Sequence, residues 1–325
     1  MIRLFANARY DFIGLRRWAY GLTAAVVIPG LSLFLVHGLN YSIEFTGGTL
    51  IQVETTAPVG TGRLRGALDA AGIRGAEIQT FGADTAYVIR ARLAGGELTA
   101  AGGGTQATAQ AVAQALDAGI GAGQYRIVRT EAVGPKVGRE LQGKAFLAIL
   151  FSFVVTLAYL AIRFEWRFGL AAVLATGHDI LATIAFLRYL NLEVSLVVVA
   201  AVLTVVGYSL NDTIVIFDRV RENLHKYRRQ NFYEILNLSI NETLPRTILT
   251  GGTTIATALV LSFFAGEVIR PFALVMSFGI IVGTFSSIYV ASPVLLWIER
   301  RWPGEDVRGA RVLKPATPIE PQAAS

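Results

Sequence analysis

Ionisable side chains lie within long apolar stretches of this sequence, where a charge is costly. His178 and Asp179 stand about 16 Å into one predicted membrane helix, near the middle of a bilayer, at about 1.5 Å per residue. Asn211 and Asp212 lie in the next apolar stretch, and Arg246 lies at the start of the one after it. Inserting a charged residue at mid-membrane costs about 2.5–3.5 kcal/mol, so each of these groups needs a chemical reason.

Asp212 and Arg246 could support proton-coupled work. If their helices are antiparallel neighbours, the two residues lie at similar depth and within reach of each other. A guanidinium beside a carboxylate stabilises the anion, whereas separating the two in a low dielectric favours the protonated acid. A tenfold change in proton affinity is worth about 1.4 kcal/mol, similar to the roughly 2.3 kcal/mol that one charge gains across about 100 mV. Proton passage could therefore drive alternation between two arrangements, with the acid as carrier because Arg stays protonated.

A structural interpretation of these polar groups stays open. A buried Asp–Arg pair can simply fix the register of two helices. His178 and Asp179 can equally form a local contact that holds helices together. Asp218 and Arg219 are expected to be solvated residues at the cytoplasmic edge of the membrane.

Other kinds of chemistry find little support. There is no Cys, and the three histidines, His37, His178 and His225, fall at the outer face, at mid-membrane and on the cytoplasmic side, so we expect no metal site. Aspartyl intramembrane proteases carry Gly-x-Gly-Asp, whereas Gly-Tyr-Ser-Leu-Asn precedes Asp212 here. The glycine-rich stretch 119–123 precedes a strand, and a dinucleotide loop must open a helix. We predict no catalytic residue, no cofactor and no nucleic-acid partner.

The composition indicates a membrane protein. Of 325 residues, 53% are hydrophobic and 16% charged, against about 25% charged in soluble domains, and the mean hydropathy is +0.52. A membrane-spanning helix needs about 20 apolar residues, and six stretches meet or approach this length. The predicted spans are Trp18–Val36, Ala145–Ile162, Phe168–Leu187, Val194–Phe217, Ile248–Phe264 and Phe272–Ile298. In the last two, the small residues Gly252, Gly279 and Gly283 would allow close helix packing.

Basic residues in the short loops indicate the orientation, because they favour the cytoplasmic side. They concentrate in the N-terminal segment and after the second, fourth and sixth spans, which accounts for the net charge of +6. Both termini are therefore expected in the cytoplasm. The predicted divisions are a cytoplasmic segment 1–17, a first transmembrane helix 18–37, an extracytoplasmic domain 38–143, transmembrane helices two to six in 144–299, and a cytoplasmic tail 300–325 whose Pro- and Ala-rich composition predicts disorder.

Residues 38–143 are numerous enough for one compact domain. Strand-like patterns occur at Ser42–Phe45, Leu50–Thr55, Ala76–Phe81, Ala86–Arg92 and Tyr125–Val133, and helical patterns at Thr61–Ala71 and Thr105–Leu116. From the second strand onward the order is β-α-β-β-α-β, the ferredoxin-like order. The predicted fold is a membrane all-α bundle of six transmembrane helices plus one α+β ferredoxin-like extracytoplasmic domain.

Several motifs occur in a specific order along nearly the whole chain. The strongest is Gly-Tyr-Ser-Leu-Asn-Asp-Thr at 207–213, which runs into Asp-Arg-Val-Arg-Glu-Asn at 218–223. The others are Tyr-Asp-Phe-Ile-Gly at 10–14, Phe-Thr-Gly-Gly-Thr at 45–49, Val-Gly-Pro at 133–135, His-Asp at 178–179 and Leu-Pro-Arg-Thr-Ile-Leu at 244–249. With these motifs the sequence resembles the SecF family of protein-export membrane proteins, within the resistance–nodulation–division superfamily. One departure is Ser-Ile-Glu-Phe at 42–45, where the family usually has Gly-Ile-Asp-Phe.

The resemblance implies a subunit of the Sec export machinery that uses the proton motive force to promote late translocation of preproteins, after ATP-driven insertion by SecA. The implied partners are SecD on a separate chain, the SecY-SecE-SecG channel, YajC- or YidC-type accessory proteins, the preprotein and protons. The implied location is the cytoplasmic membrane of a bacterium or archaeon.

The resemblance also assigns proton coupling to Asp212 and Arg246, with Asn211 beside them, while His178 and Asp179 could form a polar relay. The extracytoplasmic motif residues are Glu44, Thr46, Gly47, Gly48, Gly134 and Pro135. Two alternatives stay open. One is a proton-coupled exporter of small molecules or lipids from the same superfamily, although such exporters typically unite two six-span halves in one chain. The other is a passive translocon scaffold without proton passage.

Overall fold

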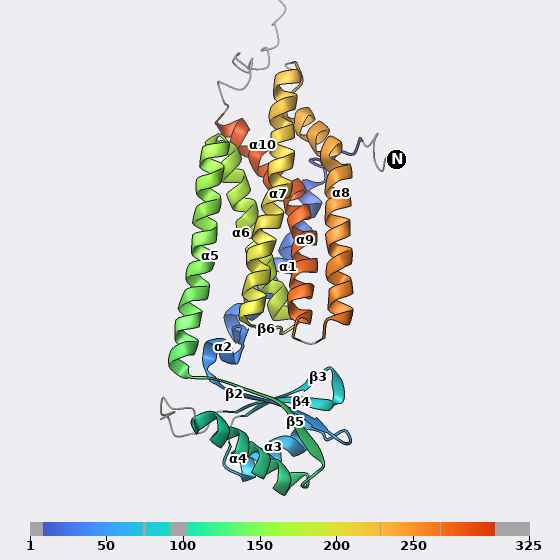
Figure 1. Cartoon of the computed structure of the whole chain (residues 1–325). Helices are drawn as coiled ribbons and strands as arrows, with labels where there is room; N and C mark the ends of the chain where they lie inside the picture. The colour runs from blue at the N-terminus through green and yellow to red at the C-terminus, as the bar shows by residue number, and fades with distance from the viewer. Residues whose placement is uncertain (1–8, 74–75, 92–102, 228, 267, 303–325) are drawn as a thin grey trace, which may run out of the picture.

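A computed structural model describes residues 9–73, 76–91, 103–227, 229–266 and 268–302 of the chain. Long apolar helices form a bundle, and a small α+β domain lies beyond one end of it (Figure 1). We call this end of the bundle the domain end and the opposite one the far end. The chain enters and leaves the described structure at the far end.

Among the described residues, six helical segments are long and apolar enough to cross a membrane, as predicted. They are α1 (Arg16–His37), α5 (Pro135–Arg163), α6 (Trp166–Tyr189), α7 (Leu196–Lys226), α8 (Phe232–Phe264), and a last segment made of α9 (Arg270–Ser286), a π-helix (Ser287–Ala291) and α10 (Ser292–Arg301).

Three helices extend well beyond their predicted spans: α7 and α8 at the far end, and α5 at the domain end, where it begins at Pro135 and not at Ala145. α7 continues past Phe217, and α8 begins well before Ile248. Asn231 and Glu234 form a reciprocal capping box that fixes the start of α8, and Pro245 lies inside the helix without ending it. Hydropathy detects only the apolar part of a helix, so the predicted boundaries missed these polar extensions. The tail beyond residue 302, predicted to be disordered, lies outside the described residues.

The last membrane segment contains the predicted span Phe272–Ile298, and a π-helical turn interrupts its α-helix. Its π-helical turn precedes Pro293, near the start of α10. Proline has no N–H to donate and its ring crowds the preceding turn, so a wider turn relieves the strain of a regular α-helix here. The Ser292 hydroxyl donates to the carbonyl of Ser287, five residues back, at 2.9 Å.

Tryptophan side chains mark one level of the bundle. The four Trp residues of the chain all lie near helix ends at the far end and are exposed: Trp18, Trp166, Trp297 and Trp302. The ring of Trp302 contacts those of Trp166 and Trp297 edge-on. Exposed Trp is enriched where a membrane meets water, so this level is expected to be an interface.

The small domain is an antiparallel sheet covered on one face by two helices. Its elements are β2 (Gly48–Thr55), α3 (Thr61–Ala70), β3 (Glu77–Phe81), β4 (Ala83–Ala91), α4 (Gly103–Gly119) and β5 (Tyr125–Val133), in the predicted order of strands and helices. The strands lie in the order β3-β4-β2-β5. Ile51, Val53, Leu64, Leu68 and Leu116 pack between sheet and helices. The opposite face of the sheet turns toward the bundle (Figure 1).

The predicted first strand, Ser42–Phe45, is wrong. The chain forms a two-residue strand, β1 (Asn40–Tyr41), and then a single helical turn, α2 (Ile43–Thr46). The Thr46 hydroxyl donates to the Ser42 carbonyl, and Gly47 ends the turn at φ 71°. Alternation of apolar and polar residues over only four positions does not distinguish a strand from a helical turn. Ile43 and Phe45 are both buried, and Phe45 packs into an apolar cluster with α6 and α7 residues.

The glycines predicted to mark close helix packing differ among themselves. A Cβ at Gly279 would lie 2.3 Å from the Val205 side chain, and one at Gly283 would lie 2.7 Å from that of Ser209, so α9 packs closely against α7 at both glycines. A Cβ at Gly252 would meet no atom of the described structure within 4 Å, so no close packing within this chain depends on that glycine.

Gly279→Ala is therefore expected to lower the free energy of unfolding by about 1–3 kcal/mol through overpacking against Val205. Gly252→Ala is the matched control, since it makes the same change in a membrane helix without a steric conflict. Chemical denaturation in detergent would measure both, and equal stability of the two variants would contradict the packing.

Candidate functional site

The carboxyl of Asp179 joins three helices. The side chain, on α6, is fully buried. Its Oδ1 lies 2.9 Å from Nδ1 of the adjacent His178. Its Oδ2 accepts hydrogen bonds from the hydroxyls of Ser209 on α7 and of Ser286 on α9, the latter at 2.8 Å. A carboxyl in an apolar interior must be satisfied by protein groups, and three neighbours do so here.

Two further polar contacts join α7 to the last membrane segment. Thr284 donates to Oδ2 of Asp212 at 3.0 Å, and the hydroxyls of Thr213 and Ser287 lie 2.8 Å apart. Asp212 and Thr213 lie three and four positions after Ser209, so each lies on the same face of α7 as Ser209. We call the eight residues with these contacts the polar seam: His178, Asp179, Ser209, Asp212, Thr213, Thr284, Ser286 and Ser287.

The π-helical turn belongs to this seam. It begins at Ser287, directly after Ser286, and both side chains are fully buried. Single π turns in long helices are frequent at functional sites. None of these hydroxyl residues was predicted from the sequence, because Ser and Thr in membrane helices commonly bond only to their own backbone. The signal available was the repetition of Ser and Thr on two apolar segments.

Asp212 and Arg246 do not touch, although the sequence analysis placed them within possible contact. Asp212 is buried, whereas Arg246 and Asn211 are exposed on the surface of this chain. No ion pair within 4 Å joins Asp212 to Arg246 in the described structure. The acid is held instead by a hydroxyl, that of Thr284.

The far end of the bundle is tied by charged pairs. Arg163 lies 3.1 Å from Asp218, and Arg219 bonds to Glu242 at 2.7 Å and to Glu222 at 2.6 Å. The expectation of solvated edge residues at 218 and 219 is therefore refined, because both are partly exposed but ion-paired. The buried Arg167 bonds to the partly buried Glu299 at 2.5 Å.

The segment before α1 docks on the far part of α8. Oδ1 of Asp11 accepts hydrogen bonds from the Tyr233 hydroxyl at 2.5 Å, from Asn237 at 2.9 Å and from the Gly14 amide at 3.0 Å. The Tyr233 hydrogen bond is the main cause that lowers the pKa of Asp11 below its ordinary value. Asn241 both donates to and accepts from the backbone of Tyr10. The motif at 10–14 is thus a fixed part of the bundle.

The glycine motif, residues 45–49, lies at the domain end, between the bundle and the small domain. Oε2 of Glu44 accepts from the amide of Leu196, the first residue of α7, at 2.6 Å. Gly47 and Gly48 both have positive φ, which favours glycine. A Cβ at Gly138 of α5 would lie 2.9 Å from the Phe45 carbonyl oxygen, so α5 packs directly on α2. The longer Glu44, a departure from the usual Asp, therefore still reaches a helix terminus.

The remaining motif residues have structural positions. Gly134 caps the N-terminus of α5, and Pro135 is the first residue of that helix, where its missing N–H is not needed. Thr46 is exposed, and its hydroxyl bonds only to backbone carbonyls of its own turn.

Comparisons with known proteins agree with this architecture. The family model described as "Protein export membrane protein SecD/SecF, C-terminal" matches residues 113–301, and the "SecD/SecF GG Motif" model matches residues 32–59. The protein translocase subunit SecF of Gemmatimonas aurantiaca is 56% identical over 97% of this chain and 95% of its own length. That of Escherichia coli O157:H7 is 37% identical over 88% and 87%.

Two solved structures are similar as well. SecDF from Thermus thermophilus, described as a translocon-associated membrane protein, matches with a TM-score of 0.81 and 34% identity over 92% of this chain. SecDF in a super-membrane-facing form matches with a TM-score of 0.65 and 36% identity over 91%. The chain spans only 40% and 39% of those two SecDF chains.

Replacing Ser286 by Ala should destabilise the bundle by about 1–3 kcal/mol, because the buried Asp179 carboxyl loses a donor. Ser277→Ala is the matched control on the same helix, since the Ser277 hydroxyl donates to the carbonyl of Ala273 in its own helix, at 2.8 Å. Free energies of unfolding in detergent would compare them. Equal losses would show that Asp179 does not depend on Ser286.

Proposed function

The chain belongs to the SecF family of protein translocase subunits, and on that premise we propose that it couples proton entry to a late step in moving preproteins across the cytoplasmic membrane. The observation that carries the proposal is a buried acid, Asp212, which is held by Thr284 and lies outside ion-pair distance of Arg246. A carboxyl that can gain or lose a guanidinium neighbour can bind and release a proton.

Two arrangements of one pair supply the coupling. In the present arrangement Asp212 makes a hydroxyl contact and no ion pair, and burial without a counter-ion favours the neutral acid. In the second arrangement α7 and α8 shift so that Arg246 reaches Asp212, and the proton leaves. One charge crossing about 100 mV supplies roughly 2.3 kcal/mol, enough to shift such a balance by more than tenfold.

The rest of the polar seam fits a route that leads toward Asp212. Asp179 and Ser209 lie at one level, and Asp212 lies three residues further along α7, about 4.5 Å toward the far end. A hydroxyl can donate and accept at once, so Ser209 and Ser286 suit proton transfer beside Asp179. Nε2 of His178 is buried and has no partner in the described structure. We assign His178 and Asp179 to the approach from the domain end.

The proposal places the small domain outside the cell membrane and both termini in the cytoplasm. The basic residues of the short loops gather at the far end, where the Trp residues also lie, and basic loops favour the cytoplasm. The domain's strand order β3-β4-β2-β5, with two helices on one face, supports its classification as ferredoxin-like.

Polar groups on the surface of α7 and α8 support SecD as a partner. Asn211, Arg246, Thr250 and Thr253 are exposed on this chain at membrane depth, where lipid is a poor neighbour for them. A second helical bundle would cover this face. The matched region covers 40% of the SecDF chain, which supports SecD as the source of the covering bundle. The SecY-SecE-SecG channel, YajC- or YidC-type proteins and the preprotein complete the proposed partners.

The decisive variant is Asp212→Asn, which keeps the hydrogen bond from Thr284 but cannot titrate. Translocation of a preprotein into inverted membrane vesicles should lose its proton-driven acceleration and fall to the rate seen with an uncoupler. Asp69→Asn, at an exposed position on α3, is the control and should leave the rate unchanged. Undiminished proton-driven translocation in Asp212→Asn would favour a passive scaffold, and proton-driven efflux of lipids or small molecules would favour an exporter.

A further inference from the structure

One buried cation joins the small domain to the bundle. Arg90 extends from the open face of β4 and is only 9% exposed. It bonds to Glu77 on the neighbouring strand at 3.0 Å and to Glu193, which lies in the loop between α6 and α7. A longer contact, 3.4 Å, reaches Asn40 before α2. Three segments that are distant in the sequence therefore meet at one guanidinium.

The loop that Arg90 holds leads directly into α7. Glu193 and Val194 form the two-residue strand β6, which pairs in parallel with Asn40 and Tyr41 of β1. The amide of Ser42 donates to the Val194 carbonyl at 3.0 Å. Glu44 then accepts from the Leu196 amide at the start of α7, so the carboxylate also complements the positive end of the helix dipole. A displacement of this loop displaces α7.

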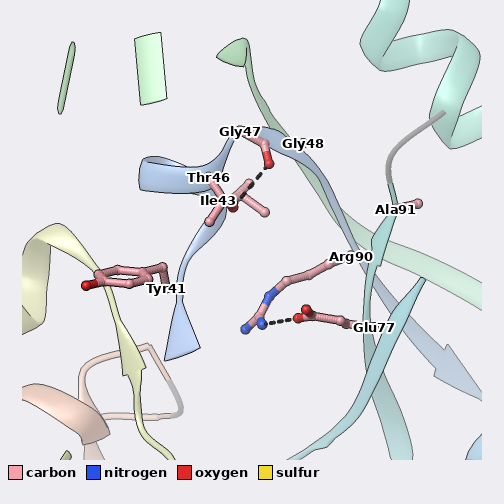
Figure 2. A pocket seen from close by; sticks show the side chains of 8 residues that line it. All are labelled: Tyr41, Ile43, Thr46, Gly47, Gly48, Glu77, Arg90 and Ala91. Atoms are coloured by element: carbon pink, nitrogen blue, oxygen red, sulfur yellow. Dashed lines mark hydrogen bonds and ion pairs between the residues drawn. The ribbon is translucent and has the colours of Figure 1, made fainter. Parts of the chain in front are cut away.

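The junction around Arg90 is loosely packed. A cavity of about 140 Å³ lies beside Arg90, between the glycine motif and β3 and β4. Figure 2 shows Arg90 reaching toward Glu77, with Tyr41 and residues 46–48 on the other side. A second cavity of about 180 Å³ separates the open sheet face from the end of the bundle. Polar contacts flanked by two cavities therefore join the open face of the sheet to the end of the bundle.

We propose that Arg90, Glu193 and Glu44 are positioning residues that couple movement of the extracytoplasmic domain to α7, the helix that carries Asp212. We call these three residues the latch. The inference rests on the proposed function, and it adds the mechanical connection between domain and proton site. When the latch is closed, the small domain fixes the domain end of α7. When the latch opens, α7 is free to change its position against α8 and α9.

The chemistry of Arg90 suits a latch that can open. The planar guanidinium can bond two carboxylates at once, which the single ammonium of Lys cannot do with the same geometry. Its Nε, however, is buried without a partner in the described structure, so the closed state carries an unsatisfied donor. The bonds of Arg90 to the two carboxylates therefore have a specific geometry, but the unpaired Nε lowers the stability of the closed latch.

Glu193 makes the latch sensitive to outside pH. Burial raises the pKa of Glu193 above its ordinary value of 4.5, Arg90 opposes this increase, and the carboxylates of Glu44 and Glu77 add to it. Arg129 and Glu131 of β5, which pair with each other, face the same cavity. A carboxyl with a raised pKa in the closed latch holds its proton more tightly there than in water. Acidification therefore favours the closed latch, and a pH rise above that pKa favours opening.

Spin labels can measure the latch in the full chain, because it contains no Cys. Labels at Asp69→Cys on α3 and Leu190→Cys in the α6–α7 loop, both exposed, report the distance from domain to bundle in lipid nanodiscs. The unmodified latch should give a narrow distance distribution, and Arg90→Ala a broad one. Arg126→Ala is the matched control, because it breaks an exposed pair with Glu54 in the same sheet. Arg90→Lys, which keeps the charge but cannot bond two carboxylates with the same geometry, should broaden the distribution less than Arg90→Ala.

The pH dependence gives an independent test in the same labelled chain. The distribution should broaden as the pH rises through the raised pKa of Glu193, and Glu193→Gln should remove this dependence. A distribution that is insensitive to pH and to Arg90→Ala would overturn the latch.

Export assays separate failure of the latch from failure of the proposed function. Arg90→Ala should slow proton-driven translocation by about three- to twentyfold, the range produced by mutations along a coupling path, with Arg126→Ala unaffected. If Asp212→Asn abolishes proton-driven translocation but Arg90→Ala leaves it intact, the latch is wrong and the proposed function stands. If neither variant changes translocation, the proposed function itself is wrong, whatever the spin labels show.

Discussion

A carboxyl group within a membrane bundle must be satisfied by the protein, because the surrounding hydrocarbon offers no hydrogen bonds. Asp179 meets this constraint through His178 on its own helix and through serine hydroxyls of α7 and α9. These contacts fix the relative depth of three helices, and they require close approach, which Gly279 and Gly283 permit on α9. The positions of Asp212 and Thr284 follow from the same register, since both lie on the helices that Asp179 holds together.

α7 is the element on which the separate parts of the molecule converge. Its first residue is held by Glu44, its middle carries Ser209 and Asp212, and its polar extension bonds to α8 through Asn223, whose amide donates to Ser239 at 3.0 Å and to Glu242 at 2.7 Å. The ends are therefore fixed by polar groups outside the apolar span, and the middle by the polar seam. A helix with this distribution of contacts can transmit a displacement along its length, because its own hydrogen bonds make it stiff.

The sequence sufficed for the six membrane segments and for the order of strands and helices in the domain, because both depend on hydrophobic periodicity. Prediction from the sequence failed where tertiary contacts determine the local backbone structure. The helical turn at Ile43–Thr46 is set by Gly47 and by burial of Phe45 against the bundle, and the π-turn by Pro293. The buried acids were identified by their cost in lipid, whereas their serine and threonine partners were not, since a hydroxyl in an apolar helix carries no such cost.

Under the proposed function, the separation of Asp212 from Arg246 belongs to one of two arrangements of this pair. The two SecDF structures are 34% and 36% identical to this chain, yet their TM-scores are 0.81 and 0.65. Sequence divergence does not account for that difference, so members of this family arrange the same elements in more than one way. Under the proposed function, the cavities beside Arg90 leave room for the domain to move. The buried Asp212, which is not paired with Arg246, then allows the bundle to respond to that movement. A rigid scaffold would gain nothing from leaving both contacts incomplete, whereas a machine that alternates requires each of them to be breakable.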